Sequence, residues 1–288
     1  MSSFTLYTDS ACDLTPELME EIGVKCISMT FTFDGEEKVY KDNEMPLENF
    51  YRLMRGGTVV RTAAINTEEF KEAFEPELEA GRDVLYLGFS SGLSTTFNCS
   101  KIAAEELMEK YPDRTVRVVD TLSASGGFGL LVYLTALQKN NGADLSQTAQ
   151  YAIDKIQNIC HWFTVDDLAY LKRGGRISPT VAFVGGLLGI KPVLHTDTEG
   201  HLVNVSKARG RKASVIALAD RYTETALHPS EGPVFICHAD CYEDAKELAE
   251  IFRKRHKLKN VKIMNIGSVI GAHSGPGTLA LFFDGKER

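Results

Sequence analysis

Two apolar runs, each followed by a helical pattern, constrain the fold of this chain more than any other feature. The runs cover residues 83–89 and 115–120, and helices are expected over about 94–110 and 123–139. A strand that is apolar at consecutive positions is typical of a parallel sheet, because both faces of such a sheet are covered. Strands that alternate with helices predict βαβ units, which bind ligands at the carboxyl ends of their strands.

The remaining elements of the first half follow from capping, turn and periodicity signals. Thr15 has the hydroxyl expected of an N-cap, and Pro16 suits the first helical position. Asp34-Gly35 is a strong turn signal after a run of β-branched and aromatic residues. We expect strands over 4–9 and 26–33, and helices over 16–23, 47–54, 67–80 and 145–157.

The second half of the chain has a different pattern, with a boundary expected near Asn158. Two short strands, 192–196 and 201–206, flank Glu199-Gly200, which predicts a hairpin and therefore antiparallel pairing. Further strands are expected over 160–165, 233–239, 261–267 and 279–283, and helices over 166–172, 212–225 and 242–257. The sequence thus predicts an α/β protein with one domain at 1–158 and a second at 159–288.

Charge and residue usage argue against several classes of protein. A formal charge of −7 and a pI of about 5.6 do not suit a nucleic-acid-binding protein, which normally has a basic face. The six cysteines have no paired C-x-x-C spacing, so we expect no metal site and reduced thiols. No apolar run is long enough to span a bilayer, and the chain opens directly into a strand pattern, so we expect a cytoplasmic protein.

Three polar segments outside the main strand and helix patterns hold the candidate functional residues. They cover 61–66, 90–96 and 271–277. The second combines hydroxyls with free N–H groups at a helix start, which suits an anion. Ser94 could equally be a simple helix cap, and the two roles are compatible. The third is read as a glycine-rich loop that leaves the side chain of His273 free to reach a cleft.

Ser94 and His273 also suggest a serine/histidine-dependent hydrolase or acyltransferase. Against this, the sequence has no G-x-S-x-G elbow, and no acidic residue stands out as the third catalytic group. The phosphate-binding pattern G-x-x-x-x-G-K-[ST] is missing as well. The preferred interpretation is therefore a binding protein that has no cofactor, and an enzyme is the alternative.

A cluster of basic residues follows the predicted hairpin in this acidic chain. It consists of Lys207, Arg209, Arg211 and Lys212. A solvated turn is the default interpretation of such a cluster. Docking of an acidic partner is the alternative, because a local positive patch can steer an acidic surface toward it.

Several motifs, in their order along the chain, resemble those of the DegV family of bacterial fatty-acid-binding proteins. Thr8-Asp9-Ser10 is similar to the T-D-S opening of that family. The other matching segments are Ser90-Ser91-Gly92-Leu93-Ser94, the pattern at 120–124, Arg173-Gly174-Gly175-Arg176-Ile177 with Leu168 and Leu171 before it, and the G-x-H-x-G-P-G pattern at 271–277. The family's T-S-Q-P-S stretch reads Thr62-Ala63-Ala64-Ile65-Asn66 here, so the threonine is kept, while the hydroxyl directly after it and the proline are lost.

The resemblance implies an N-terminal parallel α/β domain, a C-terminal α/β domain with a largely antiparallel sheet, and a ligand cleft between them. It implies a protein that binds a long-chain fatty acid and is not itself an enzyme. A separate fatty acid kinase would phosphorylate the bound acid for phospholipid synthesis. The local basic cluster around Arg209 is then the candidate docking surface for that kinase.

The same resemblance assigns roles to individual residues. Thr62, Ser94 and His273 would hold the carboxylate, with Ser91 and Arg176 as neighbours. The apolar, glycine-broken segment 181–190 is a candidate wall of the acyl tunnel or an ordinary core helix.

Overall fold

A four-stranded parallel sheet forms the centre of the N-terminal part of the chain. The computed structural model describes residues 3–178 and 189–288. In sheet order the strands are β2 (Val24–Ile27), β1 (Phe4–Asp9), β6 (Asp83–Gly88) and β7 (Val116–Asp120), and every pairing is parallel. The prediction of a parallel sheet from the apolar runs is confirmed.

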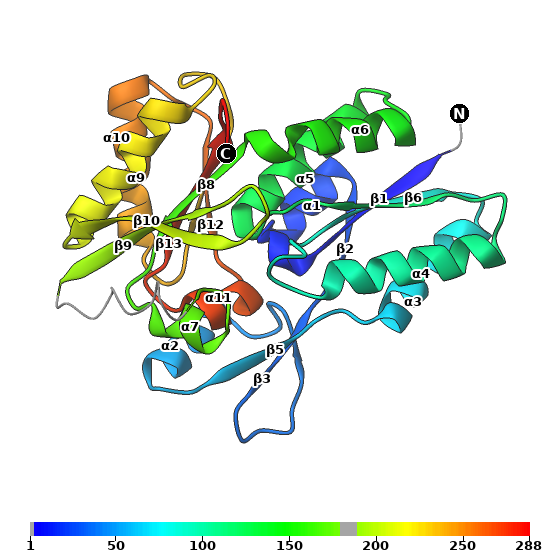
Figure 1. Cartoon of the computed structure of the whole chain (residues 1–288), viewed down its shortest axis with the longest axis horizontal. Helices are drawn as coiled ribbons and strands as arrows, with labels where there is room; N and C mark the ends of the chain where they lie inside the picture. Colours follow the sequence, from blue (N-terminus) through cyan, green and yellow to red (C-terminus); the bar gives the residue numbers. More distant parts are fainter. Residues whose placement is uncertain (1–2, 179–188) are drawn as a thin grey trace.

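Helices cover both faces of this parallel sheet (Figure 1). On one side lie α3 (Thr67–Glu79) and α4 (Thr96–Lys110); on the other lie α1 (Pro16–Ile22), α5 (Ser125–Asn140) and α6 (Leu145–Lys155). Thr15 caps α1 as expected, since its side chain accepts from the Leu18 N–H and Pro16 begins the helix.

A six-stranded mixed sheet forms the C-terminal part. In sheet order its strands are β10 (Leu202–Arg209), β9 (Ile190–Thr196), β8 (Ile159–Thr164), β13 (Leu279–Asp284), β11 (Val234–His238) and β12 (Val261–Asn265). Only the pair β11–β12 is parallel among these described strands. The outer face is covered by α9 (Arg211–Thr225) and α10 (Tyr242–His256). The predicted hairpin between β9 and β10 is confirmed.

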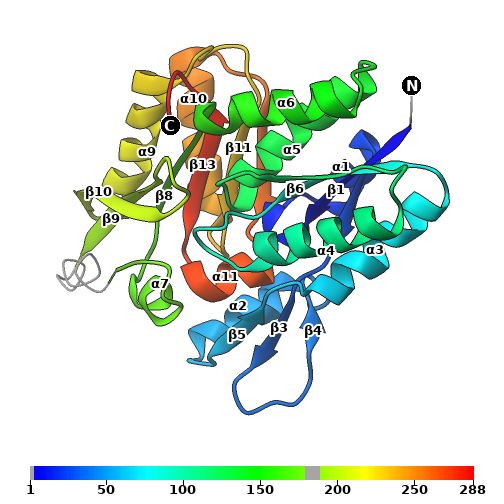
Figure 2. The same cartoon turned by 45° about the vertical axis from the view of Figure 1, so that its right-hand side comes forward.

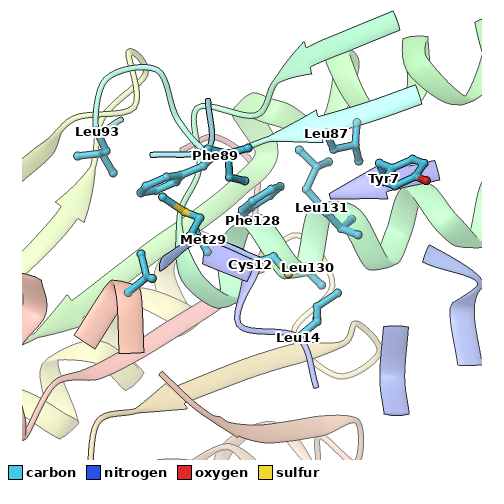
Figure 3. Packing of buried hydrophobic residues seen from close by; sticks show 14 of the residues in the cluster. Tyr7, Cys12, Leu14, Met29, Leu87, Phe89, Leu93, Phe128, Leu130 and Leu131 are labelled. Atoms are coloured by element: carbon cyan, nitrogen blue, oxygen red, sulfur yellow. The ribbon is translucent and has the colours of Figure 1, made fainter. Parts of the chain in front are cut away.

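Helix α5 packs against both sheets at once. It contacts β8, β11 and β13 of the mixed sheet as well as the helices of the parallel sheet. Figure 3 shows Phe128 of this helix beside Met29 and Phe89 in the shared core. A Cβ atom on Gly127 would lie 2.2 Å from His161 Nε2, so the glycine allows β8 to approach the helix closely.

A small antiparallel sheet was not expected from the sequence. Its strands are β4 (Tyr40–Lys41), β3 (Thr30–Phe33) and β5 (Val60–Ala63), and α2 (Leu47–Arg55) packs beside it. The single strand predicted over 26–33 is therefore wrong. It is divided between β2 and β3, which belong to different sheets, because the chain leaves the parallel sheet at Met29, whose N–H donates to Ser10 Oγ at 3.0 Å.

The segment 271–277 was predicted as a loop, and its first half is helical instead. Helix α11 (Ser268–Ser274) begins directly after β12 and lies beside α2, β5 and α7 (Ala169–Arg173) (Figure 2). Gly275, at φ +82°, ends it. Two short 3₁₀ turns, η1 (Ser10–Cys12) and η2 (Ile156–Asn158), complete the elements of the described chain.

Two expectations from the sequence concern membranes and the acyl tunnel. Across 3–178 and 189–288, none of the helices has the length and apolar character needed to cross a bilayer. Residues 181–188, which make up most of the apolar segment proposed as a tunnel wall, lie outside the described residues.

Candidate functional site

A cavity of about 470 Å³ lies where the three sheets meet. Its lining is mainly apolar and comes from both halves of the chain, with Phe89 and Leu93 after β6, Phe163 on β8, Ile270 on α11 and Phe282 on β13. The size falls within the range of about 300–1,000 Å³ that is usual for small-molecule sites.

One wall of the cavity follows β13. Thr278 at the start of this strand, then Ala280 and Phe282, all contribute to the lining. Alternate residues of a strand share one face at about 3.4 Å per residue, so these three span about 14 Å. Thr278 Oγ1 donates to the carbonyls of Ser274 and Gly275 at 2.9 and 2.8 Å, so its end of the cavity is the end that contains α11.

His273 lies on the last turn of α11 and contacts Thr62 of β5. The distance from His273 Nε2 to Thr62 Oγ1 is 2.8 Å. Burial, helped by the positive charge of Arg176, lowers the pKa of His273 to about 4, so the ring is neutral at pH 7. A Cβ atom on Gly174 would lie 2.3 Å from His273 Nδ1, so the turn after α7 must be a glycine for the ring to fit.

Arg176 closes the same end of the cavity. Its Nε donates to the Leu93 carbonyl at 3.0 Å, and its Nη1 donates to the Gly174 carbonyl. Among the described residues that line the cavity, Arg176 is the one with a full positive charge, and none has a carboxylate. A ligand anion at this end would therefore meet a cation and no competing acidic side chain.

Ser94 lies in the turn between β6 and α4, directly before Thr95, which is the N-cap residue of that helix. Its Oγ accepts from the Thr96 N–H at 3.2 Å and lies 2.9 Å from Thr96 Oγ1. Ser91, whose N–H donates to Asp120 Oδ1 at 3.2 Å, also lines the cavity. Ser94 is therefore not the N-cap residue, although its hydroxyl accepts the first N–H of the helix, and the same residue belongs to the cavity wall.

The five sequence-predicted site residues are all part of the cavity lining. They are Thr62, Ser91, Ser94, Arg176 and His273. Apart from Arg176, four polar lining residues lie outside the three segments predicted from the sequence: Ser125 at the start of α5, His161 on β8, Thr196 on β9 and Thr278. His161 was hidden within a strand pattern, and the position of Ser125 depends on a left-handed φ of 53° that no sequence signal marks.

The geometry does not favour a hydrolase. The hydroxyl of Ser94 is paired with Thr96, and His273 is paired with Thr62. Within the described part of the chain, no hydrogen bond joins Ser94 to His273, and no acidic side chain of the lining can orient the imidazole.

The four basic residues proposed for docking do not form one uniform patch. Strand β10 continues to Arg209, beyond the predicted end at 206, and Lys207, Arg209 and Lys212 are exposed. Arg211 instead forms ion pairs with Asp244 at 3.0 Å and Asp166 at 3.7 Å, and its side chain is only 21% exposed. Three of the four are therefore available to a partner.

Comparison with known proteins gives consistent matches over nearly the whole chain. A family model described as an uncharacterised protein of the DegV family matches residues 3–286. A DegV domain-containing protein of Clostridium perfringens is 43% identical, covering 100% of this chain and 99% of the relative.

Solved structures give the same result. A DegV lipid-binding protein of Thermotoga maritima has a TM-score of 0.87 at 30% identity, with 99% of each chain covered. A DegV family protein of Thermus thermophilus, whose structure is described as showing fatty acid binding, has a TM-score of 0.87 at 29% identity, covering 97% of this chain and 98% of the other.

Proposed function

This chain belongs to the DegV family, and we propose that it holds one long-chain fatty acid in the cavity between its sheets without altering it chemically. The observation that carries the proposal is the composition of the cavity. A mainly apolar space has a single arginine, a neutral imidazole and several hydroxyls in its lining. This arrangement matches a molecule with a long hydrocarbon chain and one carboxylate. The fatty acid binding described for the relative from Thermus thermophilus supports the same ligand class.

The acyl chain supplies most of the binding energy in this proposal. Burial of about a dozen methylenes at about 0.8 kcal/mol each contributes on the order of 10 kcal/mol before the costs of association. Neutral hydrogen bonds contribute only about 0.5–1.5 kcal/mol each. The tail therefore sets affinity, while the polar end sets the orientation of the carboxylate.

Each polar residue has a distinct part in holding the head group. Arg176 provides the charge that compensates the carboxylate in a space with few other polar groups. His273 is neutral, so it acts as a hydrogen-bonding group beside Thr62 and not as a second cation. Ser94 adds a hydroxyl that its hydrogen bonds with Thr96 hold in place, and Ser91 lies beside it.

We further propose that a separate fatty acid kinase phosphorylates the bound acid, which then enters phospholipid synthesis. The proposal follows from the family resemblance and from a sequence without a G-x-x-x-x-G-K-[ST] phosphate loop. The exposed Lys207, Arg209 and Lys212 are the candidate docking residues, since a basic patch on a chain of charge −7 complements an acidic partner.

Mass spectrometry of the lipid released by denaturing extraction tests the ligand class directly. We expect one fatty acid per chain, and we expect added hexadecanoate to raise the melting temperature of stripped protein. Acyl esters incubated with the protein should remain intact. An extract without fatty acid, together with an unchanged melting temperature, would refute the proposal.

A further inference from the structure

Two buried carboxylates from the first half of the chain meet the start of helix α11. Asp13 Oδ1 accepts from the Gly267 N–H at 2.9 Å, and Asp42 Oδ1 accepts from the Val269 N–H at 3.2 Å. The partners are 254 and 227 positions apart in the sequence. Asp13 and Asp42 are 5% and 8% exposed, so neither bond is made at the surface.

The contact at Gly267 leaves no spare room. A Cβ atom there would lie 2.9 Å from Asp13 Oδ1 and 3.3 Å from Asp42 Oδ1, although the glycine has an ordinary φ of −67°. Tyr51 adds a third contact, since its hydroxyl donates to the Ile266 carbonyl at 2.6 Å. The entry of α11 is thus fixed by three side chains that come from elsewhere in the fold.

Helix α11 is short enough to transmit this placement to the cavity. It has seven residues, and His273 is the sixth. At about 1.5 Å per residue, His273 is less than 10 Å along the axis from the anchored start. A tilt or shift at Gly267 would therefore reach the imidazole, whose contact with Thr62 has a length of 2.8 Å.

We propose that Asp13 and Asp42 are positioning residues for the carboxylate-binding end of the cavity: they hold α11 so that His273 stays against Thr62. The inference rests on the proposed function for its ligand. It also explains the buried Asp13 and Asp42, which belong neither to the cavity lining nor to the core. The two carboxyl groups lie outside the cavity lining and act through the groups that they bind: the start of α11 and, for Asp13, also the hydroxyl of Ser125.

Three variants and a matched control separate positioning from simple stability. Asp42→Leu removes the acceptor for the Val269 N–H, whereas Asp42→Asn keeps a carbonyl oxygen in its place. Gly267→Ala retains both carboxylates and displaces the helix by steric contact. Glu77→Gln is the control, because Glu77 is 2% exposed and anchors Lys25 and Arg82 in the same half of the chain, away from α11.

The readouts are the affinities for hexadecanoate and for hexadecanol, and the ring nitrogen resonances of His273 in protein with nitrogen-labelled histidine. In Asp42→Leu and Gly267→Ala we expect the preference for acid over alcohol to fall about tenfold, the loss expected for one charge-assisted hydrogen bond. Binding of the alcohol should change little, and the His273 resonances should shift. Asp42→Asn should restore the preference for the acid. Glu77→Gln should lower the melting temperature and leave the preference for the acid unchanged.

The inference is overturned if Asp42→Leu and Gly267→Ala keep the acid preference and the His273 resonances of the original protein. It is also overturned if Glu77→Gln loses the preference to the same extent. If the original protein binds neither ligand, the proposed function fails. The His273 resonances of the unliganded variants then still decide whether the carboxylates position the ring.

Discussion

Replacement of Gly174 by alanine tests whether His273 must hold its observed place. The new Cβ would lie 2.3 Å from His273 Nδ1, whereas nonbonded atoms prefer about 3.5 Å, so the ring must move by about 1 Å. A shift of this size is large compared with the range of hydrogen-bond lengths, and the 2.8 Å contact with Thr62 would be lost or bent. The backbone itself accepts alanine, because Gly174 has φ −72° and ψ −12°.

We expect Gly174→Ala to weaken hexadecanoate binding by about tenfold, the equivalent of one charge-assisted hydrogen bond between His273 and the carboxylate. Hexadecanol should bind as before, because the tail contacts are unchanged. Titration calorimetry with both ligands measures the difference, and a thermal melt checks the fold.

The neighbouring glycine supplies the control. Gly175 has φ +72°, and a Cβ atom there would meet nothing within 4 Å. Gly175→Ala should therefore cost about 1–2 kcal/mol of stability through its backbone while leaving ligand preference unchanged. If Gly174→Ala retains full preference for the acid, or if Gly175→Ala shows the same loss, the reasoning about His273 is wrong.

Three further predictions concern pH, orientation and docking. Burial depresses the pKa of His273 to about 4 in the folded protein, so its contribution to stability is complete above the unfolded pKa of about 6.5 and is lost as the pH falls toward 4. Urea titrations should therefore show that the free energy of unfolding depends less on pH in His273→Gln than in the original protein, and an identical pH dependence would contradict this. Ser94→Ala and His273→Ala should each reduce phosphorylation of the bound acid by a cognate kinase far more than they reduce affinity for the acid. Equally small losses of phosphorylation and of affinity would mean that these residues serve only in capping and packing. Arg209→Ala should leave lipid content and melting temperature unchanged and lower phosphorylation of the bound acid, and loss of lipid from this variant would contradict the docking assignment. Arg211→Ala should instead cost about 1 kcal/mol of stability, because its ion pairs are lost.

Local signals in the sequence were enough where the local chain determines the structure. The run at 83–89 predicted a buried parallel strand because its composition alone demands burial on two faces. Thr15 and Pro16 predicted the start of α1 because capping involves only neighbouring residues.

The predictions were wrong where residues that are distant in the sequence determine the local structure. The glycine-rich segment 271–277 has the composition of a loop, yet α11 forms there because Asp13 and Asp42 accept its first N–H groups. Strand β5 has four residues and no apolar alternation, and it exists because β3 pairs with it. The acidic partners of Arg211 are likewise distant in sequence, so a sequence cluster could not show that one of its four members is already paired.

The position of α5 between the two larger sheets has a consequence for dividing the protein into fragments. A piece that ends near residue 158 would contain α5 but not β8, β11 and β13, which cover its second face. Gly126 and Gly127, now in close contact with Cys237, Phe282 and His161, would then face water as part of an apolar helix surface. Such a fragment should aggregate or recruit another copy, because exposed apolar surface of this kind favours association. We therefore expect the two halves of this chain to behave as one unit in expression and in thermal unfolding.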